Sequence, residues 1–155
     1  MAFNTILIKT VGEWFIKERL ADEILTPGML LNVEAAGEYE KHPTEGADGS
    51  AIVCVEEEYL GGVITDTYAI GDQVRAVYAQ PGDELLMRLK TGENVTFADI
   101  LKSDGAGGLV IHTPRSVNEG GSATWTQYER PAFFKALETR NNTSGGYENI
   151  QVEVL

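Results

Sequence analysis

The sequence predicts an all-β protein: a small β-barrel or β-tulip domain with an extended N-terminal arm and a short helix. Between Ile64 and Gly105, short alternating apolar segments are separated by Gly-Asp, Pro-Gly-Asp, Thr-Gly-Glu and Asp-Gly turns. Such turns fix hairpin register, because glycine adopts positive φ and aspartate bonds its own backbone. The aspartates that follow Gly71 and Gly82 are therefore interpreted as turn residues. Barrel closure fits this pattern because it removes exposed sheet edges.

The length and composition favour one folded core. The chain has 155 residues, of which 43% are hydrophobic and 23% charged, values close to those of globular domains. We predict an arm and short helix in residues 1–25 and a single β-barrel domain in residues 26–155. Polar, Gly-rich stretches predict surface insertions near residues 35–50 and 116–127.

The N-terminal segment differs in pattern from the remainder. Phe3–Lys9 is a short β-prone strip and predicts an extended arm. In Val11–Leu25, Ile16, Leu20 and Ile24 recur at fourfold spacing between charged residues, which predicts a short amphipathic helix. Its apolar stripe is expected to pack on its own domain, with a partner surface as the alternative.

The strands of the barrel are predicted from apolar segments between turns. Within 73–78, Val74 and Ala76 alternate with Arg75 and Val77, the pattern of a half-buried strand. One strand follows the Pro27-Gly28 turn, and the others are expected at Ala51–Val55, Gln73–Tyr78, Glu84–Leu89, Leu109–His112, Ala132–Leu137 and Ile150–Leu155.

Charge and hydropathy exclude several classes of partner. The formal net charge of −12 and a pI near 4.5 repel polyanions, so we expect no direct nucleic-acid binding. No apolar run approaches the roughly 18 residues that cross a bilayer, so we expect no membrane partner. Lys9 and Glu13 interrupt any signal-like apolar stretch, which predicts synthesis in the cytoplasm. The single cysteine, Cys54, lies in an apolar run and is expected to be a buried, inert thiol.

The sequence offers no pattern typical of catalysis or metal binding. Its two histidines, His42 and His112, have no nucleophile motif beside them, so we predict that the protein is not an enzyme. The acidic run 56–58 is interpreted as a solvated face, and we expect no metal and no cofactor. Lys90 follows a strand but lacks the flanking residues of a biotinyl or lipoyl carrier.

Several motifs that together span most of the chain follow one another in a definite order. They are Met1–Lys9, Leu25–Leu30 (LTPGML), Asp66–Val74 (DTYAIGDQV), Pro81–Glu84 (PGDE), Val95–Leu101 (VTFADIL), Asp104-Gly105, Phe134–Glu138 (FKALE) and Ile150–Leu155 (IQVEVL). This ordered set resembles one known family, the head decoration or capsid cement proteins of tailed bacteriophages. Two departures are Ala98, where the family usually has glycine before aspartate, and the long insertion Ser116–Gln127.

This resemblance implies a structural role in the virion. It implies a small β-barrel, commonly a homotrimer, that binds the major capsid protein on the outer surface of the assembled head and stabilises it against internal pressure. The protein would be made in the host cytoplasm and would carry no catalytic residues. Because aromatic and aliphatic anchors dominate such interfaces, the residues expected to contact capsid or a neighbouring protomer are Phe3, Ile6, Leu7, Ile8, Trp14 and Phe15.

Two other functions stay open at this point. Ile24–Leu31 also resembles antifreeze-like or SAF domains, so a small-molecule or sugar-binding barrel is the alternative from another class. A minor structural protein of the head or of a tail fibre is the third possibility.

Overall fold

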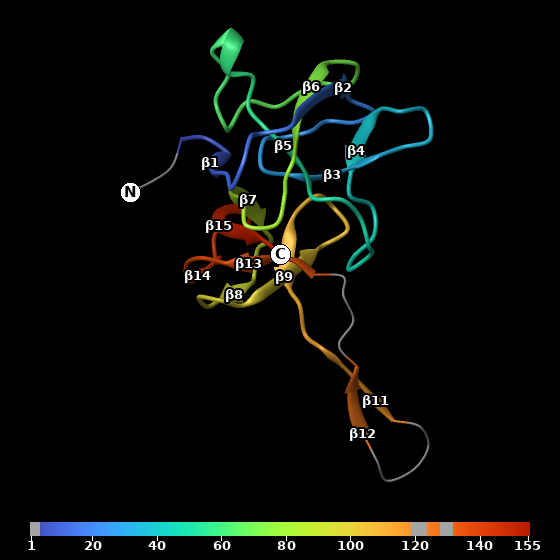
Figure 1. Cartoon of the computed structure of the whole chain (residues 1–155), viewed down its shortest axis with the longest axis vertical. Coiled ribbons are helices and arrows are strands. Elements are labelled where there is room, and N and C mark those ends of the chain that lie inside the picture. Colours follow the sequence, from blue (N-terminus) through green and yellow to red (C-terminus); the bar gives the residue numbers. More distant parts are fainter. Residues whose placement is uncertain (1–3, 119–123, 128–131) are drawn as a thin grey trace.

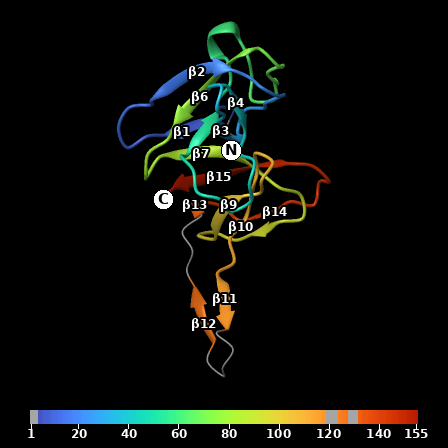
Figure 2. The ribbon, with the colours of Figure 1, turned by 90° about the vertical axis from the view of Figure 1, so that its right-hand side faces the viewer.

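The computed structural model describes residues 4–118, 124–127 and 132–155, and only the backbone of residues 115–118, 124–127 and 132. The fold is nearly all β and contains a closed five-strand barrel, which confirms the predicted fold class. Two sheets lie one above the other along the long axis of the molecule (Figure 1, Figure 2). We call them the N-terminal sheet and the C-terminal sheet.

The N-terminal sheet has five antiparallel strands, and its first and last strands meet. Ala21, which directly follows the first strand, forms a bridge with Tyr39 in the last, and the Asp22 N–H donates to the Tyr39 carbonyl at 2.9 Å. In spatial order the strands are β2 (Ile16–Leu20), β6 (Gln73–Tyr78), β5 (Ile52–Cys54), β3 (Leu30–Val33) and β4 (Tyr39–Lys41).

The C-terminal sheet closes through a long pairing between its last strand and its second. β15 pairs with β7 from Glu148 opposite Leu89 to Glu153 opposite Glu84, so five of the six strands form a ring. β1 pairs only with the start of β7. In spatial order the strands are β1 (Leu7–Lys9), β7 (Glu84–Leu89), β10 (Leu109–Ile111), β9 (Ile100–Ser103), β13 (Ala132–Ala136) and β15 (Glu148–Val154).

Two short strand pairs and one turn of 3-10 helix complete the described elements. β8 (Asn94–Val95) pairs with β14 (Arg140–Asn141) beside the C-terminal sheet. β11 (Arg115–Asn118) pairs with β12 (Thr124–Gln127) and projects from the body at one end of the long axis. The 3-10 turn, η1 (Glu58–Leu60), projects at the opposite end (Figure 1).

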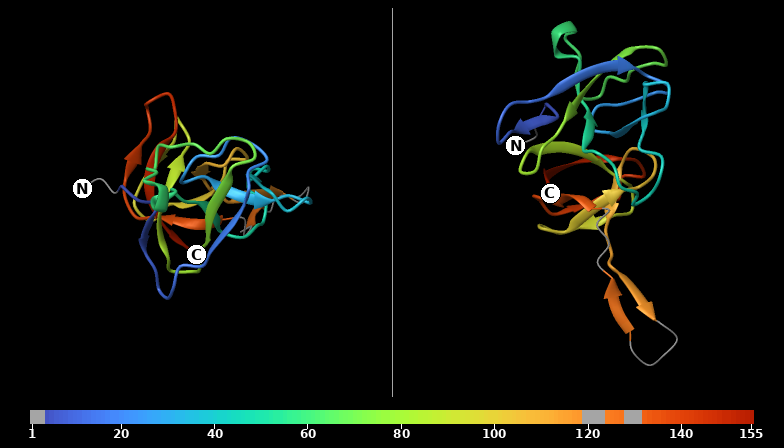
Figure 3. Two further views of the ribbon diagram at one scale, coloured as in Figure 1. Left: turned by 90° about the horizontal axis from the view of Figure 1, so that it is seen from above. Right: turned by 45° about the vertical axis from the view of Figure 1, so that its right-hand side comes forward.

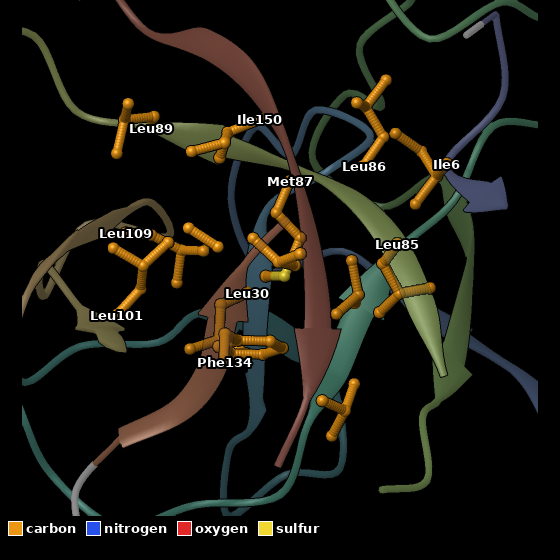
Figure 4. Packing of buried hydrophobic residues seen from close by; sticks show 14 of the residues in the cluster. Ile6, Leu30, Leu85, Leu86, Met87, Leu89, Leu101, Leu109, Phe134 and Ile150 are labelled. Atoms are coloured by element: carbon orange, nitrogen blue, oxygen red, sulfur yellow. The ribbon is translucent and has the colours of Figure 1, made fainter. Parts of the chain in front are cut away.

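Each sheet encloses its own hydrophobic cluster. The smaller cluster lies in the N-terminal sheet and includes Leu25, Tyr39 and Cys54, all with no exposed surface. The larger cluster fills the C-terminal sheet and also takes residues of the N-terminal sheet, so the two sheets pack as one body. Its labelled members in Figure 4 are Ile6, Leu30, Leu85, Leu86, Met87, Leu89, Leu101, Leu109, Phe134 and Ile150.

Three turns share one hydrogen-bond pattern, in which an aspartate and the residue three positions before it are joined by two hydrogen bonds. In the turn that joins β6 to β7, Asp83 Oδ2 accepts the Gln80 N–H at 2.8 Å, and the Asp83 N–H donates back to the Gln80 carbonyl at 2.9 Å. Equivalent reciprocal pairs join Ala69 with Asp72 and Thr96 with Asp99. The prediction that the aspartates after Gly71 and Gly82 are turn residues is therefore confirmed.

The helix predicted in Val11–Leu25 is wrong. Residues 16–20 form β2, which pairs along its whole length with β6, and the short helix of this protein is only the η1 turn. Leu20 and Ile24, two members of the predicted stripe, are 49% and 57% exposed and make no buried face. Pairing with β6 satisfies the backbone of this segment, and tertiary context overrides its helical spacing.

Two further expectations differ from the structure. β4 lies inside the predicted surface insertion 35–50, because Tyr39 is needed to fill the N-terminal sheet. β6 is buried on both faces rather than on one: Val74 and Ala76 pack in the smaller cluster and Val77 in the larger one. The other predicted insertion, 116–127, forms the β11–β12 hairpin in its described residues.

Candidate functional site

The predicted contact residues lie at very different depths. Ile6 has no exposed surface and belongs to the larger hydrophobic cluster. Leu7, Ile8 and Trp14 are partly buried and pack against the same cluster. Phe3 lies outside the described residues. The segment is extended, as predicted, but β1 and β2 place it within the two sheets.

Among the predicted contact residues that the structure describes, Phe15 presents the most open surface. Its side chain is 51% exposed, and its ring packs edge-on against Tyr78 at 5.8 Å between centroids. The Lys17 Nζ lies 5.1 Å from both ring centroids, a cation–π arrangement on an exposed strand. Of the described contact residues, Phe15 is therefore the one best placed to meet a partner.

A buried carboxylate holds the N-terminal segment in place. Glu56 is 4% exposed, and its two oxygens lie 3.3 and 3.2 Å from the Ile6 nitrogen, which donates to them. Asp83 binds the same segment further along, accepting the Thr10 hydroxyl at 2.9 Å and the Val11 N–H at 3.0 Å. The expectation of a solvated acidic face over 56–58 is thus wrong for Glu56 and right for Glu58, which is exposed.

Arg75 organises the remaining acidic groups at this end of the molecule. Its side chain is 8% exposed and lies 3.9 Å from Glu18 and 3.9 Å from Glu57. The guanidinium also lies 4.7 Å from the centroid of the Tyr59 ring. An arginine held between two carboxylates and an aromatic ring is a compact polar centre.

An open cavity of about 610 Å³ adjoins this centre, under the loop that carries η1. Four carboxylates line it, and none of the described residues in the lining is a lysine, an arginine or a histidine. The lining comes from three separate segments of the chain, which explains why sequence reasoning missed it. The lining residues are Glu18, Glu57, Tyr59, Leu60, Gly61, Gly62, Asp66, Thr67, Tyr68, Asp72 and Gln73.

Three other titratable side chains, those of Cys54, Tyr68 and His42, are buried in the fold. Cys54 has no exposed surface, as predicted, and burial raises the pKa of its thiol. Burial also raises the pKa of Tyr68, whose hydroxyl donates to the Val55 carbonyl at 2.7 Å. His42 Nδ1 lies 2.9 Å from the Ser103 hydroxyl, and both residues are buried.

One group of three acidic side chains lies close together in the described part of the chain. Carboxylate oxygens of Asp22, Glu34 and Glu38 are within 4.8 Å of one another. Burial, followed by the charge of Asp22, raises the pKa of Glu34. Exposed acidic groups of this kind are common without a metal, so the arrangement does not assign one.

Comparisons with known proteins leave the family unassigned. No family model matches this sequence, and a search of curated proteins found no match. Within the described residues, no helix is long and apolar enough to cross a bilayer.

Proposed function

We propose that this protein is a bacteriophage capsid decoration protein that binds the outer surface of the assembled head. The observation that carries the proposal is the ordered set of motifs that resembles this family. Three of these motifs contain the reciprocal aspartate turns of the fold, at Asp72, Asp83 and Asp99. The resemblance therefore involves residues with a definite role in building the domain.

The β11–β12 hairpin supports an interfacial role. The two strands pair with each other over four residue pairs, from Arg115 opposite Gln127 to Asn118 opposite Thr124. The pair extends away from both sheets in the side views (Figure 1, Figure 2 and the right-hand view of Figure 3). An isolated two-stranded hairpin is marginally stable in water, so contact with another protein would stabilise it. We assign it a contact with capsid or with a neighbouring subunit.

The proposed mechanism is linkage between binding and assembly. A ligand that binds only the assembled shell stabilises it by RT ln(1 + [L]/Kd), and many symmetry-related copies repeat the effect along the shell. The major capsid protein and other copies of this chain, as a homotrimer, are the partners. A net charge of −12 suits an outer surface, away from the packaged DNA.

The test is co-sedimentation with mature capsids that lack the protein, after size-exclusion chromatography with light scattering. The proposal expects a trimer that pellets at a fixed ratio to capsid subunits. Phe15→Ala and replacement of residues 116–127 by a short Gly-Ser turn should each weaken pelleting, while Phe97→Ala serves as an exposed aromatic control. A correctly folded protein that stays in the supernatant would refute the decoration role.

A small-molecule or sugar-binding barrel is the second candidate, because the cavity beside Tyr59 and Tyr68 combines aromatic rings with carboxylates. The interiors of both sheets are filled by buried side chains, so a ligand would bind at the outside of the N-terminal sheet. Thermal stabilisation by a compound in a metabolite screen would favour this function. A minor head or tail-fibre role is distinguished by locating the protein in virions.

A further inference from the structure

The loop that carries η1 presents two large apolar side chains to solvent. Tyr59 and Leu60 are 84% and 88% exposed, the highest values among the large hydrophobic side chains that the structure describes. The η1 turn that carries them lies at the end of the molecule opposite the β11–β12 hairpin (Figure 1). Exposed apolar groups rimmed by polar ones are typical of interaction surfaces.

The cavity beside these side chains carries a strong negative field. Glu18, Glu57, Asp66 and Asp72 line it, and Arg75 is the basic side chain that contacts two of them at 3.9 Å. Four carboxylates and one guanidinium leave a local charge of −3.

The two aspartates retain binding capacity. Asp66 uses Oδ2 to accept the Val63 N–H at 2.9 Å, and Asp72 uses Oδ2 to accept the Ala69 N–H at 2.7 Å. The second oxygen of each carboxylate can accept a hydrogen bond from an outside donor.

Arg75 shows which chemistry this environment accommodates. Its guanidinium lies between Glu18 and Glu57 and 4.7 Å from the centre of the Tyr59 ring. A planar cation with several N–H groups satisfies separated carboxylates and an aromatic ring at once. A second guanidinium entering from solvent would find carboxylates and aromatic rings among the residues that line the cavity.

We propose that this cavity is a docking site for a basic segment of a protein partner, with an arginine side chain entering between Tyr59, Glu57 and Asp66. The aliphatic part of the arginine would lie on Leu60, and the guanidinium would reach the carboxylates. This proposal is independent of the decoration role, since it concerns the end of the molecule remote from the hairpin.

Three observations favour a basic protein segment over other occupants. A second copy of this chain also carries a charge of −12, and like charges oppose its approach to an acidic cavity. Divalent metals require oxygens that converge on a point, yet the converging acidic group among the described residues is Asp22, Glu34 and Glu38, away from the cavity lining. The exposed apolar turn adds a surface for the aliphatic stem of a long cationic side chain.

The test uses N-acetyl-arginine amide as probe and follows amide resonances of the full-length protein during titration. The proposal expects saturable shifts at Gly61, Gly62 and Thr67, with Kd on the order of millimolar because a few exposed ion pairs and one cation–π contact are weak. Added salt should weaken binding, since it screens exposed charges. The citrulline analogue, which has the same shape without the charge, should give no saturation.

Variants distinguish arginine binding in the cavity from nonspecific attraction of the probe to an acidic protein surface. Glu57→Gln should weaken arginine binding about two- to fivefold, and Tyr59→Ala should weaken it by a similar factor. Glu58→Gln, a neighbouring exposed carboxylate outside the cavity lining, is the matched control and should leave Kd unchanged. Equal effects of Glu57→Gln and Glu58→Gln would overturn the proposal, as would shifts spread over the whole surface.

Other occupants give distinct results in the same assay. Saturable shifts at the cavity with neutral monosaccharides but not with the arginine probe would replace a basic partner by a sugar. Shifts that grow with protein concentration alone would indicate a second copy. Failure of arginine binding leaves the co-sedimentation test of the decoration role unaffected.

Discussion

Glu56 and Ile6 are joined by a buried hydrogen bond across 50 positions of the chain: the Glu56 carboxylate accepts the Ile6 N–H at 3.2 Å. The carbonyl of Ile6 in turn accepts the Leu86 N–H, in β7, at 2.9 Å. One residue of the N-terminal segment is thus bonded on one side to the residues after β5 and on the other to β7. Ile6 therefore ties the N-terminal sheet to the C-terminal sheet.

Removing this carboxylate should loosen the N-terminal segment. Glu56→Ala leaves the Ile6 N–H buried without an acceptor, at a cost of about 1–3 kcal/mol in the free energy of unfolding. Glu56→Gln keeps an amide oxygen as acceptor and should cost less. Urea unfolding curves measure the difference, and hydrogen exchange at Ile6 should accelerate more in the alanine variant.

The exposed neighbour provides the comparison for this prediction. Glu58→Ala should change the unfolding free energy by less than about 0.5 kcal/mol, because its side chain is solvated. Equal losses for Glu56→Ala and Glu58→Ala would contradict the role assigned to the buried carboxylate.

Sequence reasoning succeeded where structure is set by neighbouring residues. Gly-Asp and Pro-Gly-Asp turns are local, and the strands Gln73–Tyr78 and Glu84–Leu89 beside them were predicted with their observed bounds. It failed at residues 16–20, where fourfold apolar spacing indicated a helix. The deciding interaction there is the pairing of Ile16 with Val77, which lies 61 positions away and has no local signal.

In the candidate sites, too, the features that depend on long-range contacts could not be predicted from the sequence. Phe15, in the segment after the predicted arm, is exposed, and Ile6, in the arm itself, is buried. This difference depends on contacts with β6 and β7, so the sequence could only group both residues as apolar anchors. The acidic cavity joins Glu18 to the loop after Cys54 and to the residues before β6. No spacing rule brings three such segments together.

Ala98 is a non-glycine residue that adopts a positive φ in its turn. Its φ is +73°, in the left-handed region, where a Cβ costs about 1–2 kcal/mol. Glycine occupies the equivalent position before Asp72 and Asp83, with φ of +84° and +93°. Ala98→Gly should stabilise the protein by about 0.5–1 kcal/mol, after the entropy that glycine adds to the unfolded chain. Thermal and urea unfolding measure this gain.

The reverse change at the matching turn tests the same explanation. Gly71→Ala introduces a Cβ that meets nothing within 4 Å, so its cost isolates the backbone conformation. We expect a loss of about 0.5–1 kcal/mol, opposite in sign to the effect of Ala98→Gly. A neutral result at both positions would show that the surrounding turn relaxes to accommodate either residue.

Cys54 should be chemically silent in the native protein. Its side chain has no exposed surface, and burial together with the nearby Glu56 charge raises the pKa of the thiol, so little thiolate forms. Reaction with Ellman's reagent at pH 8 should be more than about a hundredfold slower than in guanidinium chloride, because it requires local or global unfolding. A Cys54→Ala protein that also carries Leu60→Cys should react at the rate of a free thiol. Fast modification of Cys54 in the native protein would contradict its burial.

Tyr147 should impose an alkaline limit on stability. Its hydroxyl donates to Asp104 Oδ2 at 2.6 Å. Burial and this hydrogen bond raise the pKa of Tyr147 from 10.0 to about 12. A group whose folded pKa is raised contributes stability that is complete below the unfolded pKa and disappears as pH rises through the folded pKa. The contribution of Tyr147 should therefore be constant up to about pH 10 and decline towards pH 12.

The measurement is the difference in unfolding free energy between the wild-type protein and Tyr147→Phe, taken from pH 8 to pH 12. Phenylalanine keeps the ring under Arg88, whose guanidinium lies 5.2 Å from its centroid, and removes only the ionisable hydroxyl. Other groups that titrate at high pH act equally in both proteins and cancel in the difference. An ionised Tyr147 would face the Asp104 carboxylate, a group of like charge, and should therefore destabilise the fold. If the difference in unfolding free energy between the wild type and Tyr147→Phe stays constant through pH 12, the hydrogen bond to Asp104 does not govern this titration.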